Sequence, residues 1–416
     1  MPSLRHWTRS LAQDAWLAYR NVTRQRRRSL TGVVAIAFGI IALILAAGFI
    51  EWVYWAMRED TIGSRLGHIQ IVRDGYRESG RADPFRFLLP ESSPERDAVE
   101  HVPGVLAVAP RLTFSGLASR GESTLSFIGE GIDPEKEKPF SAAVVITHGE
   151  ALSADDNLGI IVGQGLAANL GVKVGDQIVL LSNTTSGGIH AVEVHVRGLF
   201  STVSKAFDDA ALRVPLPVAQ QLLRVRGAHA WVLVLDETSR TTRVADELRA
   251  RLAGKGLQIV PWYELADFYN KTVTLFSKQV AVIKWIIALI IILSISNTLM
   301  MSVLERTGEI GTSMALGNRR MRILVQFVSE GVILGIIGGL LGVVLGVLLA
   351  LAISAIGIPM PPPPGMARGF VGEVRVTGSL VVEAFALAIV TTLLASLYPA
   401  WKAARMEIVN ALRHNR

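Results

Sequence analysis

The chain has 416 residues, of which 50% are hydrophobic and only 19% are charged, and its mean hydropathy is +0.40. Soluble domains are rarely so apolar, so membrane spans are expected together with one or two folded units. The sequence contains no cysteine, which excludes disulfides, thiolate chemistry and Cys-based metal sites. The formal net charge of +7 is best explained by basic residues that flank spans, since no nucleic-acid-reading motif accompanies it.

The first predicted span lies at residues 29–57. Its uncharged part, SLTGVVAIAFGIIALILAAGFI, reaches the ~20 residues that a helix needs to cross a bilayer. It is longer than the apolar region of a typical signal peptide, and no small-residue cleavage site follows it. Trp52, Tyr54 and Trp55 follow instead, as in the aromatic belt at a membrane surface. The segment is therefore predicted to be a retained span.

Residues 58–262 have the composition of a folded domain outside the membrane. Short alternating runs separated by Gly, Pro and Asp predict strands: HIQIV, TLSFIGEGI, DQIVLL, VEVHVRGLF and WVLVLD. Two stretches, Gly163–Gly171 and Thr241–Gly254, predict helices, the second with a glycine stop. No run in this region is long enough to span a membrane. We expect one α+β domain inserted between spans one and two.

Span two is predicted within residues 263–304, as the end of one long helix. One helical face is formed by residues at alternating three- and four-residue steps: Leu265, Phe268, Thr272, Leu275, Gln279 and Val282. Pro261 stands at the start, where helices favour proline. A helix from Pro261 to Leu304 would be ~65 Å long at about 1.5 Å per residue, roughly twice the ~30 Å of a bilayer core. Part of it should therefore project from the membrane as a stalk. Two helices with a break near Lys278 are the alternative.

Two further spans are predicted, at residues 321–358 and 376–400. In the first of these, glycines recur four residues apart, which permits close helix packing either within the chain or with a second copy. These glycines are Gly331, Gly335, Gly338, Gly339, Gly342 and Gly346. Residues 359–375 form a stiff proline-rich turn that contains Pro361–Pro364, and residues 401–416 form a basic tail. The predicted fold class is an α-helical membrane protein with four transmembrane helices and an inserted α+β domain.

Basic residues gather on one side of the predicted spans. They occur in the N-terminal segment, between spans two and three, and in the tail: Arg20, Arg24, Arg26, Arg27, Arg28, Arg306, Arg319, Arg320, Arg322, Lys402, Arg405 and Arg413. With four spans, these three segments lie on the same side of the membrane, and the excess of Lys and Arg marks that side as cytoplasmic. The α+β domain and the proline-rich turn are then external.

The sequence shows no motif of a self-sufficient enzyme. No G-x-x-x-x-G-K-[S/T], H-E-x-x-H or G-x-S-x-G occurs, and the histidines are scattered. We therefore expect this chain neither to hydrolyse ATP nor to hold a metal or cofactor. Glu330 and Glu383 are acids within predicted spans, which makes them functional candidates. Positions near span ends, or hydrogen bonds between helices, explain them equally well.

Residues 305–320 read ERTGEIGTSMALGNRR and separate two spans. Glu305 and Glu309 are four residues apart and therefore lie on one helical face. Gly311 is expected to interrupt the segment, and Gly317 to end a second short helix, SMAL. An ordinary solvated loop is one interpretation. The apolar sequence MAL, however, serves no purpose in a loop that needs only solubility, and it indicates a docking surface for a partner.

This segment closely resembles the coupling helix of the FtsX-like permeases, the superfamily of ABC transporters that includes the MacB and LolC/LolE groups. AWLAYRNVTRQRRRSLTGVVAIAFGI resembles their amphipathic N-terminal helix and first span, which assigns that helix to residues 1–28. FIGEGIDPEKE and IVGQGLAANLGVKVGDQIVLLS resemble their periplasmic domain, and LYPAWKAARMEIVNALR resembles their C-terminal end. The chain length and the GQGLA segment favour the LolC/LolE type, which has no fused ATPase domain.

The resemblance implies a permease that is moved by a separate ATPase. Two ATPase subunits, which hold the ATP and Mg²⁺, would bind a homodimer or heterodimer of permease chains in the bacterial inner membrane. Both termini would be cytoplasmic and the large domain periplasmic, with the stalks of spans one and two carrying the movement outward.

The expected ATPase contact comprises Glu305, Arg306, Glu309, Ile310, Met314, Ala315, Leu316 and Gly317. The two acids and Arg306 would pair with charges on the partner, and Met314 and Leu316 would fill its groove.

Three functions remain open within this superfamily: release of a lipoprotein or another amphipathic molecule, MacB-like efflux of small molecules or peptides, and FtsX-like signalling to a periplasmic enzyme. The first predicts an apolar cavity, open to the outer leaflet, between spans one and two. Its expected lining is Phe38, Ile41, Leu45 and Phe49. Membrane lipids and a periplasmic carrier or adaptor are further expected partners, whereas nucleic acid is not.

Overall fold

The structure is a computed structural model that describes residues 26–80, 82–202, 204–361 and 369–407. Most of the predicted N-terminal helix, Pro362–Pro364 and the end of the basic tail lie outside these residues. The chain divides into two units. The helical unit comprises Met1–Tyr54, Val273–Ile358 and Val371–Arg416, and the sheet unit comprises Trp55–Thr272 and Pro359–Phe370.

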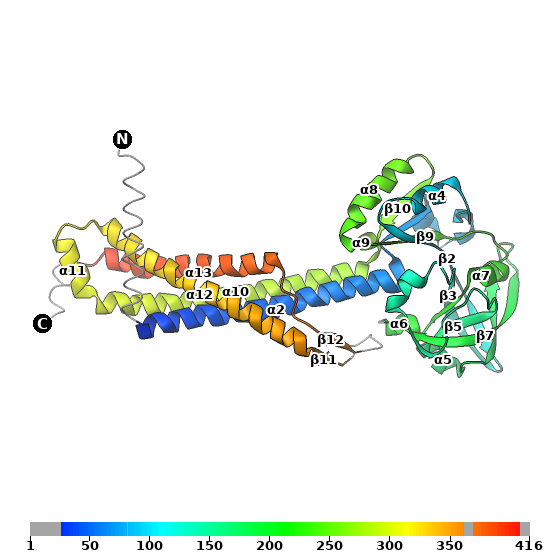
Figure 1. Ribbon diagram of the computed structural model, residues 1–416, viewed down its shortest axis with the longest axis horizontal. Coiled ribbons are helices and arrows are strands. Elements are labelled where there is room, and N and C mark those ends of the chain that lie inside the picture. The colour runs from blue at the N-terminus through cyan, green and yellow to red at the C-terminus, as the bar shows by residue number, and fades with distance from the viewer. Residues whose placement is uncertain (1–25, 81, 203, 362–368, 408–416) are drawn as a thin grey trace. The chain divides into compact units, whose positions relative to one another are not determined.

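Four helices of the described residues are long and apolar enough to cross a membrane (Figure 1). They are α2 (Arg26–Thr61), α10 (Asp267–Glu305), α12 (Arg320–Ile356) and α13 (Gly378–Ala404). A short helix, α11 (Thr307–Ala315), stands between α10 and α12, and two short strands, β11 (Ile358–Met360) and β12 (Phe370–Gly372), stand between α12 and α13. The prediction of four apolar helices is confirmed. The first continues past its predicted end at residue 57, into a π-helical turn, η1 (Ile62–Leu66).

The second long helix begins later than the sequence predicts. Pro261 is the last residue of strand β10 (Leu257–Pro261), where it pairs with Ile69, and the chain then forms a separate one-turn helix, α9 (Trp262–Leu265). Ala266, at φ −89° and ψ 57°, leaves the helical conformation before α10 starts. The predicted start at Pro261 is therefore wrong, because strand pairing and the break at Ala266 override the helical pattern. The alternative break near Lys278 is also wrong, since α10 runs through that residue.

The six regularly spaced glycines of α12 are all buried within the chain. One set faces α2 and the other faces α13, respectively Gly338, Gly342, Gly346 and Gly331, Gly335, Gly339. A Cβ atom on Gly342 would lie 2.8 Å from Ile40 Cβ and 2.9 Å from the carbonyl oxygen of Ala37. A Cβ atom on Gly331 would lie 2.6 Å from Ser396 Cβ. Such close approach of helix backbones requires glycine, so packing within the chain accounts for the whole pattern.

The sheet unit is built on a ten-stranded sheet (Figure 1). Besides β10, its strands are β1 (Ile69–Arg73), β2 (Val105–Arg120), β3 (Ser123–Ile132), β4 (Val145–Gly149), β5 (Gly159–Gly163), β6 (Gln177–Asn183), β7 (Ile189–Ser201), β8 (Ala211–Pro215) and β9 (Ala230–Leu235). Their order is β10-β1-β9-β2-β3-β8-β5-β7-β4, and β6 pairs with both β2 and β7. Because of β6, the strands β2-β3-β8-β5-β7-β6 close into a barrel. All five strands expected from alternating runs are confirmed.

Short helices pack against both the barrel and the open part of the sheet, which consists of β10, β1, β9 and the first part of β2. They are α3 (Tyr76–Ser79), α4 (Pro94–Glu100), α5 (Gln164–Leu170), α6 (Lys205–Asp208), α7 (Leu216–Leu223) and α8 (Thr241–Arg251). Two of them, α5 and α8, match the predicted helices. Helix α5 ends at Gly171, whose φ of +71° is the left-handed conformation that glycine favours at a helix end.

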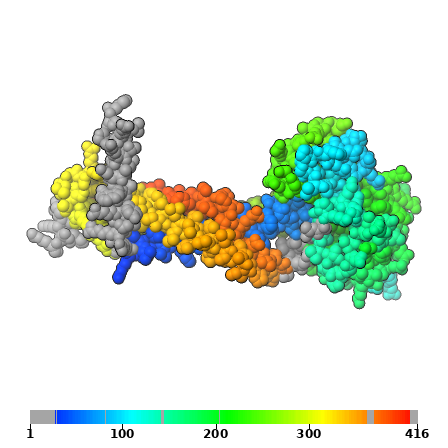
Figure 2. All heavy atoms as spheres, in the orientation of Figure 1, coloured from blue at the N-terminus to red at the C-terminus, as the bar shows by residue number. Residues whose placement is uncertain are grey.

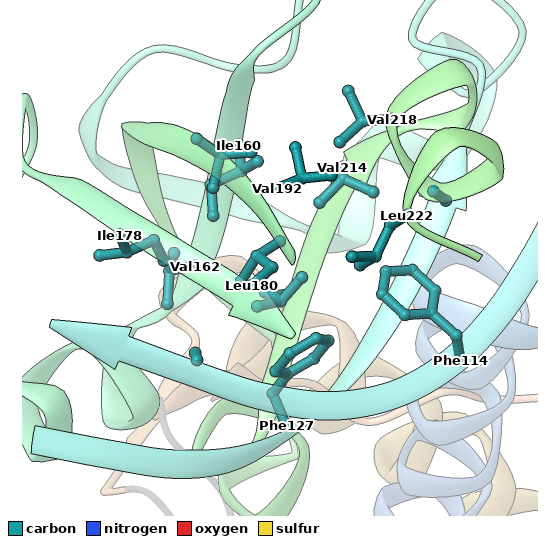
Figure 3. Close-up of a cluster of buried hydrophobic side chains, with 14 of the residues drawn as sticks. Phe114, Phe127, Ile160, Val162, Ile178, Leu180, Val192, Val214, Val218 and Leu222 are labelled. Atoms are coloured by element: carbon teal, nitrogen blue, oxygen red, sulfur yellow. The ribbon is translucent and has the colours of Figure 1, made fainter. Parts of the chain in front are cut away.

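The barrel encloses an apolar core, shown in Figure 3. Alternate residues of β6 and β7 are buried, as expected for strands with one face toward a core. Phe114 and Phe127 meet edge to face at 5.6 Å, and Val218 and Leu222 of α7 pack against the same core. A second core, under α4 and α8, surrounds Trp231.

His229 is buried beside β9, and only 2% of it is exposed. Its Nδ1 accepts a hydrogen bond from the Thr113 backbone N–H at 3.2 Å, and its ring stacks on Tyr76 at 5.4 Å. Burial lowers the pKa of His229 to about 4, because the charged imidazolium would lose its hydration. Burial also lowers the pKa of His68. Both rings are neutral in the folded protein at pH 7.

We expect the sheet unit to lose stability as the pH falls below 6.5. The unfolded chain binds a proton at His229 near pH 6.5, whereas the folded chain does so only near pH 4, so acid favours unfolding in this window. Between pH 7 and pH 5 the difference is about 2 kcal/mol for this residue. Urea unfolding followed by tryptophan fluorescence, with Trp231 in the same unit, measures it. His229→Gln should flatten the pH dependence, and the exposed control His148→Gln should not; equal slopes in both variants would contradict the assignment.

Candidate coupling surface

Helix α11 begins directly after α10 and ends in a glycine turn. Gly317 has a φ of +95°, its N–H donates to the Met314 carbonyl at 3.0 Å, and the Asn318 N–H donates to the Ser313 carbonyl at 3.2 Å. This pair of bonds is the Schellman arrangement, which satisfies the last carbonyl groups of a helix. The predicted helix end at Gly317 is confirmed, and the segment is a helix rather than a loop. The predicted interruption at Gly311 is wrong, because α11 runs through this residue, which is buried in the helix.

The inner face of α11 packs against the long helices of the same unit. Ile310 and Met314, four residues apart, are 6% and 8% exposed and contact a cluster that includes Val303 of α10, Phe327 of α12 and Ala403 of α13. The expectation that Met314 fills a groove of a partner needs correction, because its side chain already lies in the core of its own chain. Ile310 is buried there too.

Arg306 is also occupied within the chain. Its Nη1 donates to Glu330 Oε1 at 2.9 Å, its Nε donates to Glu309 Oε2 at 3.2 Å, and its guanidinium lies 5.4 Å from the centre of the Phe327 ring. The Glu330 side chain is 5% exposed. The prediction that Arg306 pairs with a charge on a partner is therefore wrong, because its guanidinium already pairs with Glu330 and Glu309. This residue fixes the start of α11 to α12.

The remaining predicted contact residues are exposed, and they lie in α11 or directly beside it: Glu305 ends α10, Glu309 and Ala315 lie in α11, and Leu316 and Gly317 follow α11. Leu316 has 84% of its surface exposed, a large value for leucine in a folded chain. Met321, in the first turn of α12, is 68% exposed and was not predicted. The sequence contained a signal for this residue, since Met321 is an apolar residue between Arg320 and Arg322. Figure 2 shows α11 in yellow at one end of the helical unit.

Two ion pairs stand at the two ends of the uncharged part of α10. Lys284 Nζ pairs with Glu383 of α13, and Arg306 pairs with Glu330. The uncharged stretch between them, Trp285–Leu304, spans about 30 Å at about 1.5 Å per residue, the thickness of a bilayer core. Glu330 and Glu383 thus lie near the span ends and pair with a residue of another helix. This agrees with the second interpretation of these acids, in which span-end positions or bonds between helices explain them.

The four residues expected to line a cavity lie on α2 in different surroundings. Phe38 is 73% exposed, Ile41 and Leu45 are half-buried, and Phe49 stacks on Trp52 at 6.1 Å. Next to Phe38, Gly39 approaches Ile287 and Ile291 so closely that a Cβ atom would lie 3.2 Å from each. Helices α2 and α10 are thus in contact at this level, and the cavity remains a hypothesis.

Two family descriptions match the chain. The MacB-like periplasmic core domain matches residues 29–251, more than half of the chain, and the FtsX-like permease C-terminal domain matches residues 281–408. The first match contains most of α2 and the sheet unit up to α8, and the second contains the later part of α10 together with α11, α12 and α13.

Several relatives have related names. An uncharacterized ABC transporter permease of Methanocaldococcus jannaschii is 24% identical over 76% of this chain and 78% of its own. The lipoprotein-releasing system transmembrane protein LolC of Xylella fastidiosa is 28% identical over 75% of this chain and 78% of its own. The macrolide export ATP-binding/permease protein MacB of Rhodospirillum rubrum is 26% identical over 94% of this chain, which spans only 58% of that protein.

The four apolar helices, the sheet domain between the first two and both family matches agree with one another. The chain belongs to the ABC transporter permeases that combine a MacB-like periplasmic core domain with an FtsX-like permease domain.

Proposed function

We propose that the chain couples ATP hydrolysis by a separate ATPase subunit to a conformational change of its MacB-like domain. The observation that carries this proposal is the two-sided character of α11. Its inner face packs on α10, α12 and α13, so a push on α11 is passed to all three helices. Leu316, directly after the last residue of α11, is exposed and available to a partner. An exposed apolar residue beside charged ones is typical of a docking surface.

The proposed assembly contains two permease chains and two ATPase subunits, the latter holding ATP and Mg²⁺. In the proposed topology, the side of the membrane that carries α11 and the tail is cytoplasmic, and the sheet unit is in the periplasm of a bacterial inner membrane; the basic residues around α11 and the tail support this orientation. Both termini are then cytoplasmic. Whether the second permease chain is identical is decided by the composition of the purified complex.

The proposed substrate is a lipoprotein or another amphipathic molecule of the inner membrane. The LolC relative, named for lipoprotein release, supports this proposal, since this chain covers most of its length. The MacB relative supports a second candidate, export of small molecules or peptides through an adaptor. A third is signalling to a periplasmic enzyme without transport, as in FtsX.

The test is purification of the full chain from its native membrane, followed by mass spectrometry. An ABC ATPase subunit is expected to co-purify in equal amount with permease chains. Co-purifying lipidated proteins would support the first substrate class, and an adaptor would support the second. A complex without any ATPase would contradict the proposed coupling.

A further inference from the structure

The end of α13 carries two aromatic and two basic side chains on one face, and all four are exposed: Tyr398, Trp401, Lys402 and Arg405. They stand three or four positions apart, the spacing at which neighbours on a helix surface meet. The rings of Tyr398 and Trp401 stack, with their centres 6.5 Å apart and their planes at 25°. The guanidinium carbon of Arg405 lies over the Trp401 ring, 4.6 Å from its centre. We call these four residues the aromatic–basic patch.

The two cations of the aromatic–basic patch are not neutralised within the part of the chain that the structure describes. Neither Lys402 nor Arg405 has a carboxylate within ion-pair distance there. Arg306 of the same unit differs, since it also lies over a ring but pairs with Glu330 and Glu309. A guanidinium that lies over a ring keeps N–H donors at its edge, where they bind forked anions such as phosphate. The patch thus offers two positive charges to an anion from outside the chain.

The patch lies where the apolar part of the helical unit ends. Ala403 of α13 belongs to the same buried cluster as Val303 of α10, and the uncharged stretch of α10 ends one residue later, at Leu304. The same face of α13 continues away from the patch as exposed apolar side chains, Leu397, Leu394 and Val390. Along its length this face changes from aliphatic to aromatic to basic. A bilayer changes in the same order, from acyl chains through the interfacial layer to charged headgroups.

Two simpler roles of the basic residues do not account for the patch. Cations in the last turn of a helix complement its partial negative charge, and cations on this side of the spans favour the proposed orientation. Neither role needs an aromatic ring beneath a guanidinium or exposed rings at the edge of the bilayer. Because the apolar part of this face lies within the membrane, its neighbour there is lipid, and a headgroup of the same lipid layer reaches Lys402 and Arg405.

We propose that the aromatic–basic patch binds the headgroup of an anionic phospholipid. Arg405 and Lys402 donate to its phosphate, while the rings of Trp401 and Tyr398 lie at the level of its glycerol. The buried side of the same turns packs against α11 through Ala403, so the bound lipid supports the helix end on which α11 lies. This site goes beyond the proposed coupling function, and lipid binding by the permease alone does not depend on an ATPase or on the substrate.

Native mass spectrometry of the full chain, released from detergent with added phospholipid, measures the binding. We expect phosphatidylglycerol to bind roughly 30-fold more tightly than phosphatidylcholine of the same chain length, about fivefold for each of the two cations. Lys402→Gln and Arg405→Gln should each remove that factor for phosphatidylglycerol and leave phosphatidylcholine unchanged. Arg320→Gln, which removes an exposed charge from the start of α12, is the matched control and should have little effect. Equal affinities for the two lipids, or an equal loss in Arg320→Gln, would overturn the proposal.

A second pair of variants tests the ring. Trp401→Leu keeps an apolar side chain but removes the ring beneath Arg405, and the affinity for phosphatidylglycerol should fall about two- to fivefold. Trp285→Leu makes the same change at the other end of the uncharged stretch of α10, where Trp285 is 77% exposed, and should leave the affinity unchanged. Circular dichroism confirms that each variant keeps its helices. An unchanged affinity in folded Trp401→Leu would refute the patch. If that variant does not fold, Arg405→Lys keeps the charge without the flat, forked group, and full binding by it refutes the patch equally.

Discussion

Replacing Leu316 with Asp is expected to abolish binding of the ATPase subunit while the permease still folds and inserts. Leu316 is 84% exposed, so the substitution disturbs no core of its own chain. In the complex, the new carboxylate would be buried against an apolar groove without a partner, which costs about 2–4 kcal/mol, or roughly a 30- to 1,000-fold loss of affinity. The fraction of ATPase that co-purifies, together with coupled and basal ATP hydrolysis, measures the effect.

Matched substitutions make this result specific. Ile189→Asp changes an equally apolar residue, 74% exposed, on β7 of the sheet unit, and should leave ATPase binding unchanged. Met314→Asp should instead reduce the amount of folded chain, because Met314 is buried among α10, α12 and α13. Gly317→Pro should uncouple ATP hydrolysis from transport by changing the backbone at the end of α11, since proline cannot adopt the φ of +95° found there. Full transport by both Leu316→Asp and Gly317→Pro would contradict the assignment of α11 and its end as the ATPase contact.

Gly342→Leu is expected to separate α12 from α2 and to prevent formation of a stable helical unit. A Cβ atom alone would lie 2.9 Å from the Ala37 carbonyl oxygen, and a backbone atom cannot move aside as a side chain can. Overpacking of this kind costs about 1–3 kcal/mol or more, and in this helix it acts at the centre of the packed face. Size-exclusion chromatography of the detergent-solubilised chain after graded heating reports the loss as a lower aggregation temperature.

The control for this substitution lies two residues away. Val344 is 54% exposed, and Val344→Leu adds bulk to the outer side of the same helix. Its aggregation temperature should match that of the native chain. If Gly342→Leu were as stable as Val344→Leu, the glycines of α12 would not be the packing contact that the structure shows.

The sequence predicted those elements whose pattern is local. Uncharged runs of about 20 residues predict membrane helices directly. In β6 and β7, apolar and polar residues alternate because only one face of each strand is buried. Strand β2 was missed for a physical reason: residues Val108–Leu112 are all buried, because this part of the strand lies between two cores. The false helix start at Pro261 has the same origin, since pairing with β1 is not visible in a local pattern.

The sequence predicted where the helix α11 lies along the chain, but not which of its residues face the core and which face outward. Ile310 and Met314 are spaced by four residues, and this spacing alone places them on one face, which the structure shows to be the inner one. Leu316 falls outside that face. The pairing of Arg306 with Glu330 joins residues 24 positions apart on different helices, and no local spacing encodes it. Likewise, the four-residue spacing of the glycines predicts close helix packing but does not indicate which helix is the neighbour.

Strand β2 belongs to both halves of the sheet unit. Its first part, Val105–Arg111, pairs with β9 in the open half, and its last part, Leu117–Ser119, pairs with β6 to close the barrel. A single peptide-bond cut within this strand would therefore open both halves at once. The MacB-like domain therefore has no boundary within β2 at which it separates into two parts.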